Sequence, residues 1–417
     1  MRLSGGSAEA GAAERAVPAA VALLRDLIGF ESVSHRSNRD IADYIADYLA
    51  RFGVEARRLP NAAGDKVALL ATLGPADQPG VVLSAHTDVV PVEGQRWSSP
   101  PFAATLRDQR VYGRGSTDMK GFIATVLAAV PKFLGTAGRT PVHIALSYDE
   151  EVGCAGADDL VAAVAGLPAP PALCIVGEPT GLRVARAHKG KLARRLVFTG
   201  RGGHSALPHR AANAVEAAAR MAVALSALGA ELRVRHDPAF DPPWSSVHVG
   251  SLHGGGALNL VPDRAVLEFE VRTLPGEDEA ALIARLDALQ REAHAALAAQ
   301  APEAGVAMEP ISAYPGLDTP AQSWPVTLGA ALSGAAAAGA GEPTTLAFGT
   351  EAGLYARAGI PTIVCGPGDI ARAHKADEWI GFDELAAAGA MMSRLASLLH
   401  APLDAWPLRA PASPPTS

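Results

Sequence analysis

Six acidic and imidazole side chains follow apolar runs at widely separated places in this 417-residue chain. Carboxylate oxygens and imidazole nitrogens suit zinc, cobalt or manganese, so these residue types indicate a site for divalent metal ions. Five of the six lie in the first half of the chain, and the sixth lies near the C-terminus. They are His86, Asp118, Glu150, Glu151, Glu178 and His374. The sequence therefore predicts one site built from both ends of the chain.

Two of these residues have neighbours that sharpen the prediction. Asp88 follows His86 by two residues, and a carboxylate at that spacing can hold the second ring N–H of the histidine. Asp118 follows the Gly-rich string GRGST, and its two oxygens can bridge metal ions about 3.5–4 Å apart. Alternatively, Asp118 caps the helix predicted to follow it. A phosphate-binding loop is a further alternative, although the GxxxxGK[ST] spacing is absent.

Asp149, Glu150 and Glu151 form a run of three acids at the end of an apolar segment. Repulsion among such carboxylates is unfavourable unless cations or protons intervene. A solvated turn is the alternative reading of this run. With metal ions present, one carboxylate can bind a metal while its neighbour takes a proton from water.

Short β-rich runs alternate with Ala/Leu-rich stretches along most of the chain. This alternation predicts an α/β fold with a mostly parallel central sheet and helices on both faces. Ligands of such sheets collect beyond the carboxyl ends of the strands, where the predicted metal ligands lie. The expected strands are 66–73, 80–86, 142–148, 173–176, 345–348 and 362–365. The expected helices are 17–28, 41–52, 121–133, 157–165, 325–338 and 382–399.

The pattern changes between residues 187 and 302, where strands are expected at 191–200, 245–252 and 265–273 and helices at 213–228 and 277–299. This order predicts a small ferredoxin-like α+β domain inserted into a catalytic domain made of residues 1–186 and 303–417. An open edge of the small sheet could pair with a second copy, so a homodimer is a reasonable hypothesis.

Composition argues against several classes of partner. The formal net charge is −7, and no block of five basic residues occurs, which disfavours nucleic acid or an anionic membrane. Three cysteines without CxxC spacing favour a reducing cytoplasm. The N-terminal sequence lacks the apolar region of a signal peptide, and no apolar stretch is long enough to predict a membrane span.

Six strings resemble those of the co-catalytic zinc amidohydrolases, a family of deacetylases, desuccinylases, aminoacylases and carboxypeptidases. The resemblance runs in order from about Arg25 to Leu399. The strings are SAHTDVVP, GRGSTDMKG, SYDEEVG, GEPTG, GRGGHSALPH and AHKADEW. The resemblance implies two divalent metal ions, zinc with cobalt as an alternative. His86, Glu178 and a bridging Asp118 would bind one ion. Glu151, His374 and the same Asp118 would bind the other.

The resemblance also implies roles for residues around the metals. Glu150 would be the general base, and Asp88 would orient His86. The inserted domain would serve for dimerisation or as a lid. From it, His204 would reach a neighbouring subunit's site and stabilise the developing oxyanion, unless it is simply a surface turn residue. Asn259 and Arg272 would bind the substrate carboxylate, although Arg272 could equally be an exposed strand residue.

The string FGTEAGLYARAGIP bears on the substrate. A carboxylate at Glu351 would favour a cationic substrate tail such as the ammonium of ornithine, unless it is only a favourable acid at a helix start. Desuccinylases usually have arginine where Leu354 stands. We therefore expect hydrolysis of N2-acetyl-L-ornithine to L-ornithine and acetate, in arginine biosynthesis. The alternatives are a broader N-acyl-amino-acid deacylase, a succinyl-diaminopimelate desuccinylase or a dipeptidase. From other classes, the alternatives are a non-catalytic binding protein on this scaffold and a nucleotide-binding protein.

Overall fold

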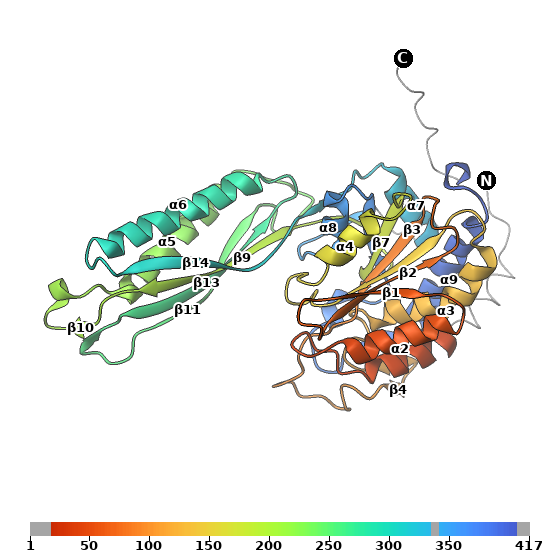
Figure 1. The fold of residues 1–417 in the computed structure, drawn as a ribbon, viewed down its shortest axis with the longest axis horizontal. Helices are drawn as coiled ribbons and strands as arrows, with labels where there is room; N and C mark the ends of the chain where they lie inside the picture. Colours follow the sequence, from red (N-terminus) through yellow and green to blue (C-terminus); the bar gives the residue numbers. More distant parts are fainter. Residues whose placement is uncertain (1–17, 335–341, 407–417) are drawn as a thin grey trace, which may run out of the picture. The chain divides into compact units, whose positions relative to one another are not determined.

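The computed structural model describes residues 18–334 and 342–406, which divide into two compact units (Figure 1). Within the described residues, the first unit comprises 18–187, 317–334, 342–345 and 350–406, and the second spans His188–Gly316 and Leu346–Gly349. The second unit starts at His188, and the expected boundary lies at residue 187. Its end lies beyond the predicted residue 302, because an additional strand, Gly305–Tyr314, extends the unit to Gly316.

A nine-stranded sheet forms the centre of the first unit, in the order β1-β2-β6-β3-β7-β17-β8-β15, with β16 paired to β8. The middle strands β6, β3, β7 and β17 run parallel, and β1, β2 and β8 add antiparallel pairs on either side. The four parallel strands are buried along their whole length, as their unbroken apolar runs predict. The strands are β1 (Ala56–Pro60), β2 (Val67–Leu73), β3 (Val81–His86), β6 (Val142–Ser147), β7 (Leu173–Pro179), β8 (Ala185–His188), β15 (Leu317–Asp318), β16 (Thr344–Leu346) and β17 (Thr362–Gly366).

Helices cover both faces of this sheet, which confirms the predicted fold class. Figure 1 shows α2, α3 and α9 on one face and α4 and α8 on the other. Residues 18–28 are also helical. The predicted helix 325–338 ends at Ser333, where Gly334 adopts a left-handed conformation, and residues 335–338 lie outside the described residues. The labelled helices are α2 (Arg39–Ala50), α3 (Lys120–Thr136), α4 (Asp158–Ala165), α7 (Trp324–Ser333), α8 (Ala352–Arg357) and α9 (Phe382–Leu398).

A small three-stranded sheet was not predicted. Its strands are β4 (Thr105–Arg107), β5 (Arg110–Tyr112) and β18 (Trp379–Gly381), in the order β18-β5-β4. Strands of three residues are too short to show a period in the sequence. This sheet joins the segment before Asp118 to the segment after His374, so it helps to bring the two predicted ligands together.

The second unit is a four-stranded antiparallel sheet in the order β11-β13-β9-β14, packed against α5 and α6. Buried and partly exposed residues alternate along β13, as predicted. The missed strand is β14 (Gly305–Tyr314), which extends the unit to residue 316. Pro310 within this run weakens its strand signal, because proline cannot donate to the ladder and is confined to edges. The other elements are β9 (Gly190–Thr199), α5 (Ala214–Leu232), β11 (Ser246–Gly254), β13 (Arg264–Thr273) and α6 (Glu279–Ala298).

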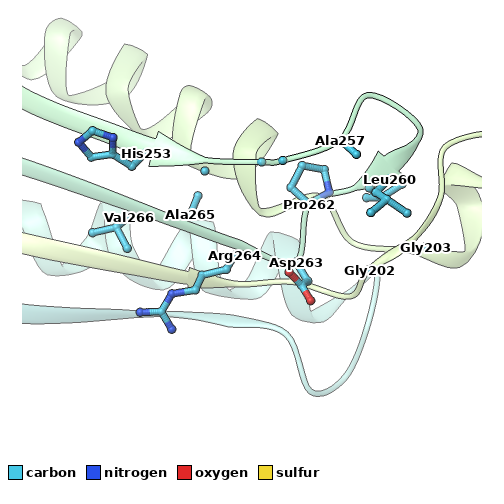
Figure 2. A pocket seen from close by; sticks show the side chains of 14 residues that line it. Gly202, Gly203, His253, Ala257, Leu260, Pro262, Asp263, Arg264, Ala265 and Val266 are labelled. Carbon is cyan, nitrogen blue, oxygen red and sulfur yellow. The ribbon is translucent and has the colours of Figure 1, made fainter.

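A short antiparallel pair of strands, β10 (Gly203–His204) with β12 (Leu260–Val261), lies at one end of this second unit. Beside it is a pocket of about 530 Å³ (Figure 2). Its lining is mostly glycine and apolar side chains, with His253, Asp263 and Arg264 as the exceptions. This lining lacks the concentration of acids and histidines found in the first unit.

Within the two described ranges, none of the helices is long and apolar enough to cross a membrane.

Candidate metal centre

The predicted ligands gather at the carboxyl ends of the parallel strands. His86 is the last residue of β3, and Glu178 is the next-to-last residue of β7. Glu150 and Glu151 follow the end of β6. Asp118 lies just before α3, and His374 follows a short 3₁₀ helix (Ile370–Arg372) after β17. Strands and loops far apart in sequence thus bring these side chains to one edge of the sheet.

The side chains form two groups that share Asp118. Nε2 of His86 lies 3.2 Å from Oδ1 of Asp118 and 3.7 Å from Oε1 of Glu178. Nε2 of His374 lies 3.3 Å from Oδ2 of Asp118 and 3.0 Å from Oε2 of Glu151. The two oxygens of Asp118 therefore face different histidines, as a bridging ligand requires.

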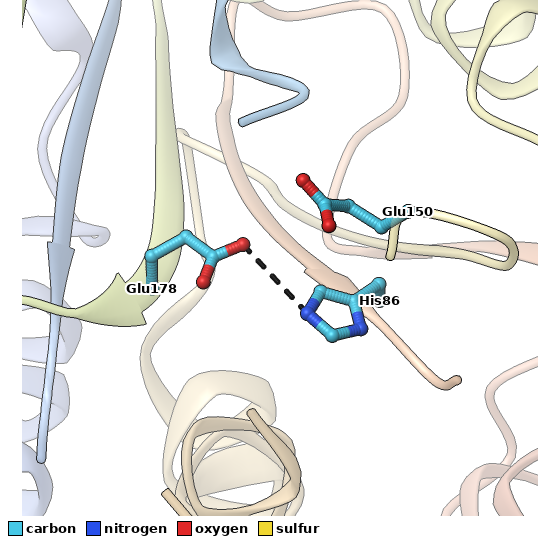
Figure 3. A group of neighbouring side chains, drawn as sticks. All are labelled: His86, Glu150 and Glu178. Carbon is cyan, nitrogen blue, oxygen red and sulfur yellow. Dashed lines mark ion pairs between the residues drawn. The ribbon is translucent and has the colours of Figure 1, made fainter. Parts of the chain in front are cut away.

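Glu150 lies on the His86 side of this arrangement. One ligand atom each from His86, Glu150 and Glu178 lie within 4.8 Å of one another (Figure 3). The same holds for His86, Asp118 and Glu151. Glu150 is thus close enough either to complete a metal site or to exchange protons with a molecule bound there, and its position alone does not choose between these roles.

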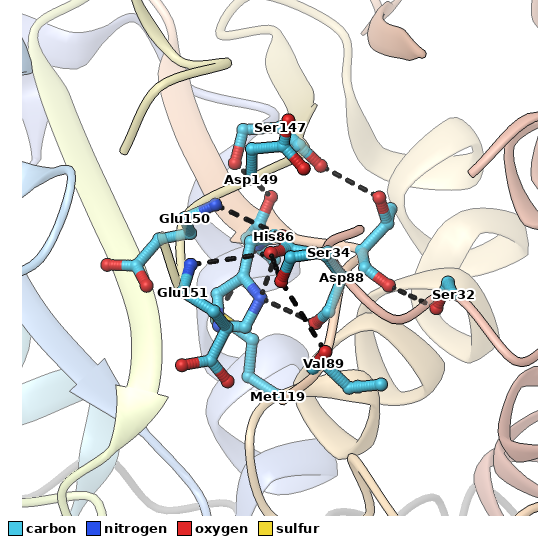
Figure 4. Close-up of polar contacts among 12 residues, drawn as sticks. Ser32, Ser34, His86, Asp88, Val89, Met119, Ser147, Asp149, Glu150 and Glu151 are labelled. Atoms are coloured by element: carbon cyan, nitrogen blue, oxygen red, sulfur yellow. Dashed lines mark hydrogen bonds and ion pairs between the residues drawn. The ribbon is translucent and has the colours of Figure 1, made fainter. Parts of the chain in front are cut away.

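Asp88 connects His86 to the two glutamates. The Nδ1 atom of His86 lies 2.9 Å from the backbone oxygen of Asp88 and 3.5 Å from its carboxylate, so the backbone carbonyl is the nearer acceptor. The carboxylate accepts hydrogen bonds from the backbone N–H of Glu150, at 3.2 Å, and of Glu151, at 3.3 Å. The Ser34 hydroxyl also donates to it, at 2.7 Å (Figure 4). Asp88 therefore fixes the glutamate backbone as well as the imidazole ring.

The third acid of the run, Asp149, has a different role from its neighbours. Its carboxylate forms an ion pair with Lys66, whose Nζ atom also donates to the backbone oxygen of Ser34. Lys66 is buried, so the pair is sheltered from solvent. Asp149 thus anchors the turn that carries Glu150 and Glu151, and the run is more than the solvated turn that was the alternative.

The electrostatics of the cluster fit bound cations. Burial raises the pKa of Glu150 to about 8 and, together with the nearby Asp118, that of Glu151 to about 7. Burial also raises the pKa of Glu178 well above its usual range. Oε1 of Glu151 is buried and has no hydrogen-bond partner. Buried carboxylates that lack donors are costly, and divalent cations would relieve that cost.

The two histidines compete with cations for the same oxygens. Hydrogen bonds to Asp118 and Glu151 raise the pKa of His374 to about 10. Burial opposes the charged form of His86, but its bonds to Asp118 and Asp88 outweigh burial and raise its pKa well above the usual value. Without cations the cluster therefore holds protons that metal binding would release.

Glu351 does not have the position expected of a residue that binds a substrate tail. It is 1% exposed, at the start of α8. The hydroxyls of Ser84 in β3 and Ser147 in β6 donate to its two oxygens, at 2.5 and 2.6 Å. A substrate ammonium would have to displace both hydroxyls inside the sheet. In this structure Glu351 instead supports the two strands that carry His86 and the glutamates.

The other residues expected to contact substrate lie in the second unit. His204 and Asn259 are exposed. The guanidinium of Arg272 is bonded to the carboxylate of Glu270 and, at 2.8 Å, to the Tyr314 hydroxyl. Arg272 is thus a partly exposed strand residue with partners of its own, and its role toward substrate remains a prediction, as do those of His204 and Asn259.

Sequence reasoning missed two buried residues beside the site, Arg114 and Glu378. They form an ion pair of 2.7 Å close to Asp118. The only sequence signal was an acid four residues after His374, and acids in loops are too common to single out.

Residues 82–398 match the model of peptidase family M20/M25/M40. The chain is 34% identical over 376 residues to an acetylornithine deacetylase of Proteus mirabilis, covering 87% of this chain and 92% of the relative. It is 33% identical over 384 residues to an acetylornithine deacetylase of Myxococcus xanthus, covering 91% and 97%.

The chain belongs to peptidase family M20/M25/M40. It is accordingly a hydrolase of amide bonds, which confirms the predicted enzyme class. Solved structures share its fold. An M20 family metallo-carboxypeptidase from Sulfolobus solfataricus aligns with a TM-score of 0.73 at 18% identity, covering 91% of this chain and 99% of that one. A dinuclear metal-binding M20 peptidase from Bacillus subtilis aligns with a TM-score of 0.63 at 16% identity, covering 93% and 99%.

We expect the metal-free protein to lose stability as the pH rises from about 5 to about 8. The folded state keeps protons on Glu150, Glu151 and His374, whose pKa values are raised to about 8, 7 and 10, whereas the unfolded chain loses them near the ordinary values. Because the folded state binds more protons, its free energy of unfolding falls with pH. The contribution is complete below the ordinary glutamate value of about 4.3 and is lost as the pH passes the raised values.

The measurement is the melting temperature of EDTA-treated protein across this range. We expect a fall of several degrees. Zinc-loaded protein is the control and should change less, because cations take the place of the protons. A melting temperature of the chelated protein that rises with pH would contradict this account.

Proposed function

We propose that five of the six predicted site residues bind two divalent metal ions, zinc or cobalt. His86, Glu178 and one oxygen of Asp118 would hold the first ion. His374, Glu151 and the other oxygen of Asp118 would hold the second. The division of the Asp118 oxygens between the two histidines, at 3.2 and 3.3 Å, supports this arrangement. Imidazole with carboxylate oxygen is a ligand set common to zinc and cobalt.

The ions would supply Lewis acidity, which favours the attack of water on an amide carbonyl. Glu150 would hold the proton taken from the attacking water and then deliver it to the departing nitrogen. A raised pKa, about 8 in the metal-free site, suits a group that must both accept and return a proton. Asp88 would keep His86 and the Glu150 backbone in place through the contacts described above.

N2-acetyl-L-ornithine is the substrate we propose, with L-ornithine and acetate as products, in arginine biosynthesis. The observation that carries this proposal is the similarity to acetylornithine deacetylases at 32–34% identity across 86–91% of the chain. The burial of Glu351 removes the structural argument for a cationic tail, so substrate identity rests on these relatives.

The second unit would complete substrate binding. From there, His204 would reach the site of a neighbouring subunit and stabilise charge developing on the carbonyl oxygen, and Asn259 and Arg272 would bind the substrate carboxylate. The fork of an arginine guanidinium suits a carboxylate, although in the structure Arg272 already bonds to Glu270.

We further propose that two copies pair through β11, an edge strand of the four-stranded sheet, to form a homodimer. Sedimentation velocity would show this as a species of twice the monomer mass, and a single monomeric species at micromolar concentration would reject it.

The three cysteines are buried and free, which fits a reducing cytoplasm.

Turnover by metal-loaded protein on a substrate panel tests the proposed activity. We expect the highest kcat/KM with N2-acetyl-L-ornithine, followed by N-acetyl derivatives of neutral amino acids. N-succinyl-diaminopimelate and dipeptides should be poor substrates. Equal turnover of all acetylated amino acids would instead indicate a broad deacylase, and preference for a dipeptide would indicate a dipeptidase. Protein that binds metal but hydrolyses none of these would reject the activity.

A further inference from the structure

Glu378 lies between His374 and β18, and its carboxylate is completely enclosed. The side chain is 1% exposed. Oε2 accepts hydrogen bonds from Nη1 of Arg114, at 2.7 Å, and from the backbone N–H of Gly115, at 3.0 Å. Oε1 accepts from the backbone N–H of Thr117, at 2.9 Å, and of Asp118, at 3.0 Å. One carboxylate thus binds four donors of the loop that ends at the bridging ligand.

Arg114 extends this network to His374. Its Nη2 atom donates to the side-chain oxygen of Gln95, at 2.6 Å, and its Nη1 atom lies 3.3 Å from the backbone oxygen of Lys375. Gln95 in turn donates to the backbone oxygen of His374, at 3.0 Å. The Arg114–Glu378 pair therefore ties together the two loops that carry Asp118 and His374.

The two proposed metal positions differ in how the backbones of their ligands are held. In the first position, His86 and Glu178 belong to β3 and β7, whose backbones are fixed by the sheet. In the second position, His374 and Glu151 both lie in loops, and the imidazole of His374 is 52% exposed. The second position thus depends more on contacts outside the sheet.

We propose that Glu378, with Arg114, is a positioning residue for the second metal ion, the one bound by Asp118, Glu151 and His374. It holds the Asp118 and His374 loops at the spacing that the ion requires, and it has little effect on the first ion. This rests on the proposed function, in which the site binds two ions. Outer contacts of this kind typically change metal affinity about 10–100-fold when removed.

Glu378→Gln tests the proposal, because it keeps the size of the side chain but removes its charge and turns an NH₂ group toward backbone N–H donors. The measurement is calorimetric titration of metal-free protein with Co²⁺, together with the visible absorption spectrum of the bound ion. We expect the dissociation constant of the second Co²⁺ to rise about 10–100-fold. The first should stay close to that of the wild type. Turnover at limiting Co²⁺ should fall and should recover when excess Co²⁺ is added.

Glu384→Gln is the matched control. Glu384 lies in the same C-terminal segment and pairs with Arg372, at 2.6 Å, and with the backbone N–H of Gly381, at 2.8 Å. It makes the same chemical change without touching the Asp118 loop. Both Co²⁺ ions should bind to this variant as they do to the wild type.

The outcomes separate the proposal from the function on which it rests. Wild-type protein that binds fewer than two ions would reject the proposed metal pair. Wild-type protein with two ions and a Glu378→Gln variant that binds both equally well, or loses both equally, would overturn the positioning role. If Glu378→Gln does not fold, Arg114→Lys decides the question, because it keeps the charge and loses the second branch of the fork. Selective weakening of the second ion in that variant supports the proposal, and unchanged binding overturns it.

Discussion

Glu150→Gln should lower kcat by about 10²–10⁴-fold while leaving both metal ions bound. Glutamine fills the same space but cannot take a proton from water or return one to the departing nitrogen. Turnover of N2-acetyl-L-ornithine gives the rate, and elemental analysis of dialysed protein gives the metal content. Both measurements are needed, because the position of Glu150 beside His86 and Glu178 also allows it to be a ligand.

Glu151→Gln provides the comparison for this prediction. It makes the same change one residue later, at a side chain whose Oε2 lies 3.0 Å from His374. We expect this variant to lose metal as well as activity. If Glu150→Gln also lost one ion, Glu150 would be a ligand. Full activity in Glu150→Gln would remove it from the reaction altogether.

His86→Ala should lose the first metal ion and nearly all activity. The imidazole is the only nitrogen ligand in that half of the site as we assign it, and its removal leaves buried carboxylates facing one another. Loss of an outer contact alone costs about 10–100-fold in affinity, so removal of a ligand should cost more than about 100-fold. Titration of the metal-free variant with Zn²⁺ measures this directly.

His143→Ala shows whether such a loss reflects the ligand or the fold. His143 is a buried histidine of β6, the strand beside β3, and its Nδ1 atom lies 2.9 Å from the Thr72 hydroxyl. We expect this variant to melt at a lower temperature and still bind two ions. A His86→Ala variant that binds two ions with wild-type affinity would contradict the assignment of His86.

The residues at the carboxyl ends of the parallel strands could be predicted from the sequence. His86, Glu150 and Glu178 each follow or end an apolar run, and parallel strands place such ends along one edge. Asp118 and His374 lie in loops, and no period in the sequence places a loop residue. Their residue types indicate metal binding, whereas their assignment to particular ions comes from the family resemblance, and the structure brings them to the same edge.

Residues held by distant partners could not be predicted. Glu351 turns into the sheet because the hydroxyls of Ser84 and Ser147, which lie 267 and 204 residues away in sequence, donate to it. Glu378 faces donors about 260 residues earlier in the chain. Local sequence gives no sign of such pairings. The missed strand β14 is a different case, since Pro310 interrupts the pattern that would have shown it.

The burial of Glu351 bears on attempts to redesign selectivity in hydrolases of this kind. A carboxylate in the string TEAG invites charge reversal to attract anionic amides. Here, such a change would place a cation beside two serine hydroxyls in the buried interior, where its desolvation is costly. Libraries aimed at new amides should therefore keep this glutamate constant and vary solvent-facing positions, of which Asn259 is one that we propose to contact substrate.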